Sequence, residues 1–133
     1  MASGDVIIRV EGLTMGFGST VIMENLDFDV NAGEVFVILG GSGSGKSTLL
    51  KHMIGLYEPM AGRILIGDRD ITRAQGAERE AVLRRIGVMY QMGALFGSMT
   101  LLENIRLPLE VHTRLPRQAM NQIALAKLQL VGL

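Results

Sequence analysis

The sequence predicts an α/β fold with a mixed β-sheet that includes an antiparallel region. Two observations support this. Apolar and acidic residues alternate over 24–30 (ENLDFDV), which is the period of a half-buried strand. The run 34–39 (EVFVIL) is apolar without alternation, as expected for a strand that is buried on both faces, and glycines and serines join it to a helix-forming segment. Strands therefore dominate the first half of the chain, and helices follow.

Shorter patterns predict the remaining elements. Three further strands are expected at 6–10, 63–66 and 87–91, and a turn at 31–33. Helices are expected at 46–54, over the second half of 70–85, and at 101–107, where Pro108 should end the helix. A last helix should begin near Pro116 and end at Gly132. Its apolar face would comprise Met120, Ile123, Ala124, Leu128 and Val131.

Composition limits the possible functions. The chain has 133 residues, enough for one domain, and its 13 basic and 13 acidic side chains balance. A neutral balance gives no electrostatic reason to expect a nucleic-acid partner. The lack of cysteine excludes disulfides and cysteine-ligated zinc. No signal peptide is visible, and no apolar run approaches the roughly 20 residues of a membrane helix, so any membrane role should act through a partner.

The strongest motif is a phosphate-binding loop that fits G-x-x-x-x-G-K-[ST] at every fixed position. Glycines allow the backbone to turn several N–H groups towards an anion, and the helix that follows points the positive end of its dipole at the same place. Lys46 would reach the β- and γ-phosphates of ATP, and the Ser47 hydroxyl would bind Mg²⁺. The predicted ATP-binding residues of the loop are Gly40, Gly41, Ser42, Gly43, Ser44, Gly45, Lys46, Ser47 and Thr48.

A glycine-rich turn with a chance lysine is the alternative. The predicted buried strand before the loop and the helix after it are the context that a P-loop requires, and they favour phosphate binding. The dinucleotide-binding pattern G-x-G-x-x-G fails, because Lys46 stands where its last glycine would be.

Over essentially its whole length the chain resembles the ATPases of ABC transporters. The P-loop continues as GGSGSGKSTLLKHMIGLYEPMAGRILIGDRDI, in the form typical of that family. The segment IGVMYQMGALFGSMTLLENI resembles the family's Q-loop, so Gln91 is expected at the end of a strand, in contact with Mg²⁺ and the attacking water. Phe17 corresponds to the aromatic residue that stacks on adenine, although it could instead be a core residue. The resemblance thus implies catalytic roles for Lys46 and Gln91.

Within that family, the stretch from Gln91 to Gly132 is most similar to Mla-type (Mce-associated) phospholipid-transport ATPases. The runs PLEVHT and KLQLVGL are the more specific parts of this resemblance, whereas ALF and ENI occur in many importers. Met92 departs from the pattern, because a small polar residue is expected there. The implied cargo is phospholipid or a related hydrophobic molecule.

The resemblance also indicates what the sequence lacks. Residues 1–108 correspond to a RecA-like core and 109–133 to the start of a helical subdomain, but a Walker B segment, an LSGGQ signature and a switch histidine are not found. The nearest Walker B look-alike, at 64–68, has no glutamate after Asp68 and is better interpreted as a strand and turn. We therefore expect a truncated chain that binds nucleotide without hydrolysing it and that self-associates through unpaired backbone edges and apolar surface.

The family resemblance implies partners and a location. A second ATPase subunit would complete the site, and a permease would contact residues 92–107, where Leu95, Phe96, Met99 and Leu101 could form the groove. The expected location is the cytoplasmic face of a bacterial inner membrane. Three alternatives stay open: a soluble ABC protein of translation or repair, a P-loop kinase or GTPase, and a nucleotide-binding module without catalysis. His52 and His112 have no ligand-spaced neighbours, so a metal role is not expected of them.

Overall fold

The computed structural model describes residues 4–133, which form two compact units. The first unit extends to Val88, and the second comprises Met89–Leu133. Each unit has its own secondary structure and its own buried side chains, so the two are described separately.

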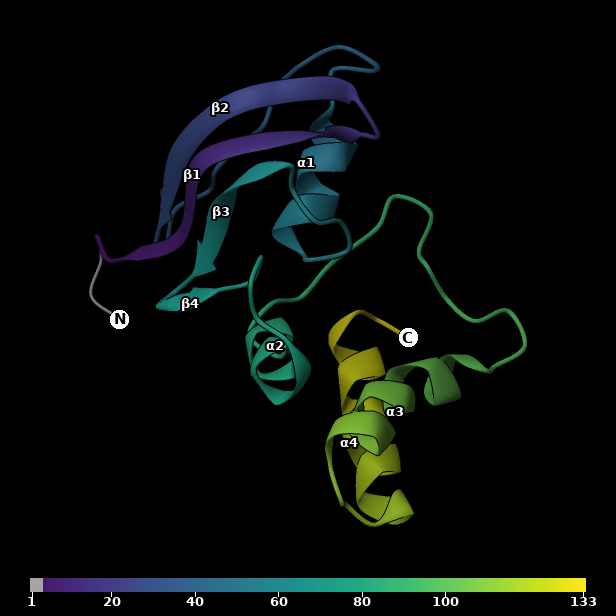
Figure 1. The fold of residues 1–133 in the computed structure, drawn as a ribbon. Helices are drawn as coiled ribbons and strands as arrows, with labels where there is room; N and C mark the ends of the chain where they lie inside the picture. The colour runs from purple at the N-terminus through teal and green to yellow at the C-terminus, as the bar shows by residue number, and fades with distance from the viewer. Residues whose placement is uncertain (1–3) are drawn as a thin grey trace. The chain divides into compact units, whose positions relative to one another are not determined.

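A four-stranded antiparallel sheet is the centre of the first unit (Figure 1). It consists of β1 (Val6–Phe17), β2 (Thr20–Asn31), β3 (Ala61–Ile66) and the short β4 (Arg69–Asp70), in the spatial order β2-β1-β3-β4. The strands expected at 6–10, 24–30 and 63–66 are confirmed, although the first two are longer than predicted. Of the expected mixed sheet, the described residues form only the antiparallel part.

One face of this sheet forms the core of the first unit. Val10, Met15 and Ile64 point into it and are fully buried, and they pack with Leu49 of α1 (Lys46–Met53). Val82 of α2 (Gly76–Leu83) is also fully buried in this cluster. Both predicted helices are therefore confirmed. Packing of α1 against β1 fixes the helix that follows the glycine-rich loop.

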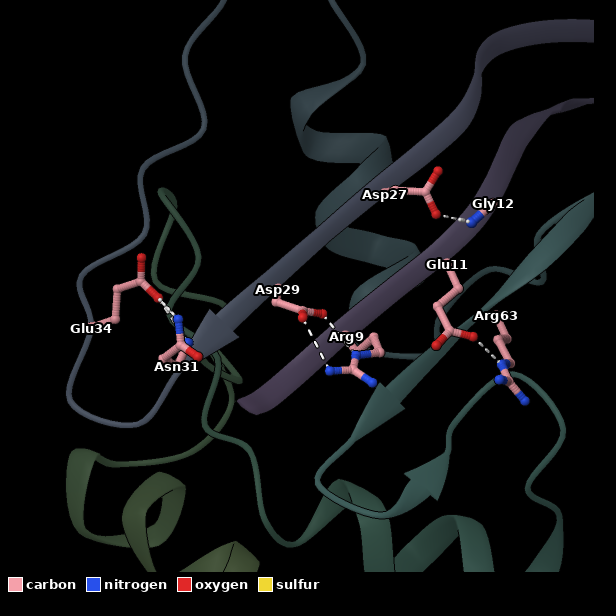
Figure 2. A network of polar contacts seen from close by, with 8 residues as sticks. All are labelled: Arg9, Glu11, Gly12, Asp27, Asp29, Asn31, Glu34 and Arg63. Carbon is pink, nitrogen blue, oxygen red and sulfur yellow. Dashed lines mark hydrogen bonds and ion pairs between the residues drawn. The ribbon is translucent and has the colours of Figure 1, made fainter. Parts of the chain in front are cut away.

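The other face of the sheet carries paired charges (Figure 2). Arg9 on β1 bonds to Asp29 on β2, with 2.9 Å between Nε and Oδ1. Glu11 on β1 pairs with Arg63 on β3 at 2.5 Å. The residues of each ion pair are direct cross-strand partners, so the charges reinforce the register that the apolar face requires.

The strand predicted at 34–39 is wrong. These residues have no ladder partner among the described residues, and Val35 and Leu39 expose 88% and 87% of their surfaces. The apolar pattern is that of a strand covered on both faces, but a strand requires a neighbour to accept its backbone hydrogen bonds. Side-chain contacts hold parts of the segment: the Glu34 carboxylate accepts from the Asn31 N–H at 2.7 Å, and the Phe36 ring stacks on that of Phe28 at 5.0 Å. The turn predicted at 31–33 is confirmed.

The strand predicted at 87–91 is also wrong, for the same reason. Residues 86–90 have no regular structure, and Met89 is 92% exposed. In contrast, the Walker B look-alike at 64–68 is the strand and turn that the sequence predicts. Gly67 takes a left-handed conformation with φ of 63°, and Asp68 forms an ion pair with Arg85 at 3.1 Å.

Two helices make up most of the second unit, namely α3 (Leu101–His112) and α4 (Arg117–Leu130). The prediction that Pro108 ends the first of them is wrong, because α3 continues for a further turn. A proline removes only one helical donor. The last turn is closed by Thr113, whose backbone N–H and hydroxyl donate to the Leu109 carbonyl at 2.9 and 2.6 Å.

The last helix begins and ends close to the predicted residues. Pro116 is its N-cap, and Gly132, with φ of 81°, follows its C-cap. The N–H groups of Gly132 and Leu133 bond to the Gln129 and Leu128 carbonyls, each at 3.1 Å, which is a Schellman motif. Of the predicted apolar face, only Met120 and Ala124 are buried. No helix within residues 4–133 has the length and apolar character needed to cross a membrane.

Candidate functional site

The P-loop residues line a pocket of about 330 Å³ in the first unit. Its walls are residues 42–48 of the loop and of the start of α1, together with Ile22 from β2. Gly45 is the N-cap of α1, has φ of 87° and lacks a side chain to cap the helix. The first-turn N–H groups of α1 therefore face the pocket together with the positive end of the helix dipole, which suits an anion.

Lys46 places its ammonium group inside the loop. Its Nζ donates to the Gly40 and Gly41 carbonyls, both at 2.6 Å, and to the Ser44 hydroxyl at 3.1 Å. These bonds fold a flexible side chain back over the glycines, so that the positive charge lies against the loop carbonyls and the Ser44 hydroxyl. A cation held on this loop, together with the N–H groups at the start of α1, can bind a polyphosphate.

The space around Gly40 and Gly45 requires glycine, whereas nothing lies within 4 Å of a Cβ atom added at Gly41 or Gly43. A Cβ atom at Gly40 would lie 2.6 Å from the Ser44 hydroxyl oxygen. One at Gly45 would lie 2.9 Å from Cγ2 of Ile22. Side chains at these positions would fill the cradle, so the packing agrees with the sequence motif. The exposed Ser47 follows Lys46 in the first turn of α1 and lines the same pocket.

Phe17 is the last residue of β1, and its side chain is 53% exposed. The alternative that it is a core residue is therefore not supported. Its strand partner is Thr20, so it lies at the tip of the β1–β2 hairpin, the same hairpin that contributes Ile22 to the pocket wall. The structure thus places a partly exposed aromatic ring on the element that borders the P-loop.

Gln91 belongs to the second unit. It lies in an exposed turn and not at the end of a strand, since the strand expected before it is not formed. The Gly93 N–H bonds to the Tyr90 carbonyl at 3.2 Å, and Gly93 and Ala94 both have positive φ angles. This compact turn exposes the Gln91 side chain.

The loop after that turn is held by hydrogen bonds, and it carries the residues that are expected to contact a permease. Leu95, Phe96 and Leu101 are half-exposed or more, which favours a surface role over internal packing. Asn104 holds the loop in place: its amide accepts from the Phe96 N–H at 2.8 Å and donates to the Phe96, Met99 and Thr100 carbonyls at 3.0–3.2 Å.

The start of α3 closes the same loop with a capping box. The Thr100 hydroxyl accepts from the Glu103 N–H at 3.2 Å, and the Glu103 carboxylate accepts from the Thr100 N–H at 2.8 Å. The Thr100 backbone bond, together with the Thr100 hydroxyl, lowers the pKa of the Glu103 carboxyl group. Loop and helix therefore form one bonded structure.

Sequence reasoning missed two contributors to the site. Ile22 was outside the predicted strand 24–30, but it lines the pocket because β2 begins at Thr20. The run Gly16 to Gly18 was the available signal, since glycines around one aromatic residue are typical of a hairpin end. Tyr57, whose ring contacts Phe17, had no such signal, because its neighbours in space are distant in sequence.

Comparison with known proteins agrees with this geometry. The sequence model of the family described as ABC transporter matches residues 23–133. A probable ribonucleotide transport ATP-binding protein of Mycobacterium leprae is 48% identical over 96% of this chain, which covers 37% of that relative. The intermembrane phospholipid transport system ATP-binding protein MlaF of Haemophilus influenzae is 41% identical over 96% of this chain and 48% of that relative.

Solved structures give the same result. A dimeric bacterial ABC transporter cassette superimposes with a TM-score of 0.84 at 28% identity, over 95% of this chain and 57% of that one. A dimeric cassette in a post-hydrolysis state, bound to ADP and Pi, superimposes with a TM-score of 0.83 over the same shares. The expected fold class is therefore confirmed. The chain spans about a third to a half of the length of the curated relatives described above.

Proposed function

Because this chain belongs to the ABC transporter family, we propose that it is the nucleotide-binding part of an ATP-hydrolysing transporter subunit. The observation that carries the proposal is the P-loop pocket, in which the Lys46 ammonium, the glycine backbone and the N-terminus of α1 converge. These groups would bind the phosphates of ATP. We assign adenine stacking to Phe17, in line with its partly exposed ring on the bordering hairpin.

We assign Mg²⁺ to the Ser47 hydroxyl and, in the assembled protein, to Gln91. Bound Mg²⁺ would neutralise charge on the phosphates. The fit of Ser47 rests on its place beside Lys46 in the first turn of α1. The role of Gln91 rests on the family resemblance of its turn, since it lies in the other unit. As catalytic residues, Lys46 would stabilise developing charge on the γ-phosphate, and Gln91 would orient the attacking water.

A titration of the purified chain with ATP and GTP, with and without Mg²⁺, tests the first part of this proposal. We expect magnesium-dependent preference for ATP. Lys46→Ala should weaken binding about 10- to 100-fold, because it removes charge-assisted hydrogen bonds worth about 1.5–3 kcal/mol. Tighter binding of GTP than of ATP would favour the GTPase alternative. Equal affinity of the wild type and Lys46→Ala would contradict the assignment of the pocket.

The 133 residues alone should not hydrolyse ATP, because they contain no Walker B glutamate, signature sequence or switch histidine. We expect the rate of phosphate release to equal that of Lys46→Ala. A higher rate in the wild type would show that the chain holds a complete catalytic site, and it would contradict the prediction. On its own, this chain should thus bind nucleotide without hydrolysing it.

We propose that the assembled transporter moves phospholipid. The ATPase subunit would lie at the cytoplasmic face of a bacterial inner membrane. Support comes from the runs PLEVHT and KLQLVGL, which resemble Mla-type ATPases, and from the similarity to a phospholipid-transport relative. The partners would be a second ATPase subunit and a permease that contacts residues 92–107, where apolar side chains are exposed on the loop that Asn104 holds.

A cellular experiment distinguishes the two cargoes that the relatives' names suggest. Lys46→Ala in the chromosomal gene should change the distribution of phospholipid between envelope membranes and leave ribonucleotide uptake unchanged. The opposite result would replace phospholipid with ribonucleotide as the cargo. Co-purification of the protein with ribosomes instead of membranes would favour the soluble alternative.

A further inference from the structure

We infer that Tyr57 is a positioning residue that orients the Phe17 ring for base stacking and connects it to the P-loop helix. The inference rests on the proposed function, because it gives Tyr57 a part in binding the adenine of ATP. It is carried by a row of contacts that begins at the exposed tip of the β1–β2 hairpin and ends at the first turn of α1.

The row begins with the rings of Phe17 and Tyr57. Their centroids are 5.4 Å apart and their planes lie at 84°, which is the edge-to-face arrangement that aromatic pairs prefer. Phe17 ends a strand at the tip of a hairpin, and Gly18 next to it has φ of 59°. A ring in that place has few neighbours to fix its rotamer. Contact with Tyr57 supplies a support and still leaves 53% of the Phe17 side chain exposed.

Hydrogen bonds and a contact with Lys51 fix the position of Tyr57. The N–H groups of Leu56 and Tyr57 both bond to the Lys51 carbonyl, at 2.8 and 3.3 Å. The Lys51 ammonium donates to the Tyr57 hydroxyl at 3.3 Å and lies 5.2 Å from the centroid of its ring. Three residues further on, the Met60 N–H bonds to the Thr14 carbonyl of β1 at 2.8 Å. These bonds anchor the Tyr57 segment to both α1 and β1.

His52 continues the row into the core. Its ring lies 5.6 Å from that of Tyr57, at 77°, and its side chain is almost completely buried. Nδ1 of His52 donates to the Thr48 carbonyl at 2.8 Å, while Nε2 has no partner among the described residues. The Nδ1 bond thus fixes the buried His52 ring to the backbone of α1, and the ring packs edge-to-face against Tyr57.

The row therefore connects the proposed base-binding ring to Thr48 of the P-loop. Loss of the Tyr57 ring would free Phe17 to sample other rotamers, and a base would then have to order it on binding. This argument predicts a selective effect: the base contribution to affinity should fall, whereas the phosphate contribution should not. A purely structural role would reduce both contributions together.

Calorimetric titrations of the chain with magnesium ATP and with magnesium tripolyphosphate separate these contributions. We expect Tyr57→Leu to weaken ATP binding about 3- to 10-fold, in line with the strength of an aromatic pair, and to leave tripolyphosphate binding unchanged. Tyr57→Phe keeps the ring and should bind ATP nearly as the wild type does. Phe28→Leu is the matched control, because it removes a ring of another aromatic pair, stacked on Phe36 at 5.0 Å. It should bind both ligands normally.

The variants also separate this inference from the proposed function. Wild-type ATP affinity in Tyr57→Leu, or equal losses for ATP and tripolyphosphate, would overturn the positioning role. Normal ATP binding in Phe17→Leu would overturn it too, while the phosphate site would stand. If the wild-type chain binds neither ligand, or if Lys46→Ala binds both normally, the proposed function fails and the inference fails with it.

A second measurement does not depend on the stability of Tyr57→Leu. The chain has two tyrosines and no tryptophan, so Tyr90→Phe leaves Tyr57 as the only strong fluorophore. ATP should change the Tyr57 emission after correction for adenine absorption, and tripolyphosphate should not. The response to ATP should disappear when Phe17→Leu is added. Unchanged emission at saturating ATP would contradict the inference.

Discussion

At the scale of single residues, Gly62 shows how closely the backbones of the first unit approach one another. It has φ of 83°, and a Cβ atom there would lie 2.4 Å from the Gly12 carbonyl oxygen and 2.5 Å from that of Glu11. The register between β1 and β3 shifts beside it, between Glu11 and Thr14. The contact is with backbone atoms, which cannot move aside as the end of a side chain can.

We therefore predict that Gly62→Ala lowers the free energy of unfolding by about 2–4 kcal/mol, because overpacking adds to the conformational cost. The control is Gly33→Ala. Gly33 has a similar φ of 78°, but nothing lies within 4 Å of its added Cβ atom, so the cost should be about 1 kcal/mol. Urea denaturation measures both. Equal losses would show that the conformation alone, and not the contact, requires glycine at position 62.

Residues are predictable from sequence where their chemistry is local. The P-loop has a fixed spacing, so the sequence alone singles out Lys46 and its glycines, and their binding of ATP stays a prediction. Tyr57 could not be found, because its role depends on a contact with a ring 40 positions earlier in the chain. Gln91 was located by resemblance, but the strand before it is not formed.

At the scale of elements, the capping box of α3 gives a prediction about pH. Hydrogen bonds from Thr100 lower the pKa of Glu103. A carboxyl group whose folded pKa is lower than its unfolded pKa stabilises the fold above the unfolded value, and this stabilisation is lost as pH falls through the folded value. Protection factors of the amides at the start of α3, which correct for the pH dependence of intrinsic exchange, should therefore fall in acid, below the ordinary range in which glutamate titrates.

A matched variant checks the cause. Thr100→Ala removes the hydroxyl but keeps the backbone N–H, so the pKa of Glu103 should rise part of the way towards its ordinary value. The titration can be followed by NMR at the Glu103 carboxyl carbon. Thr113→Ala is the control, because Thr113 closes the other end of the same helix. The same Glu103 pKa in wild type and Thr100→Ala would contradict the assignment of the shift.

Elements were predicted well where the chain supplies their partners. β1, β2 and β3 pair with one another, and the amphipathic helices bury at least part of their apolar faces, so periodicity was sufficient. The segments 34–39 and 87–91 have the composition of buried strands, but no strand among the described residues pairs with them. A hydrophobic pattern indicates that a segment is suited to burial. It does not identify the neighbouring element that would bury the segment.

At the scale of the whole molecule, these unpaired segments predict self-association. Val35, Leu39 and Met89 each expose more than four-fifths of their surfaces. Exposed apolar residues next to unpaired backbone groups favour pairing between copies. Light scattering should show a mass above that of one chain of 14.4 kDa, rising with concentration. Val35→Lys should reduce it, whereas Val111→Lys on the exposed surface of α3 should not. A compact monomer at all concentrations would contradict this prediction.

The connectivity of the sheet has a consequence for the order in which the molecule folds. The Glu11–Arg63 pair joins positions 52 residues apart, whereas the bonds from Asn104 span at most eight. Closing a long loop costs more entropy and takes longer than closing a short one. On refolding, amides around Phe96 and Thr100 should be protected in pulse-labelling experiments before those at the β1–β3 pairing. During synthesis, the β1–β2 hairpin can form early, but the other edge of β1 stays unpaired until β3 has been made.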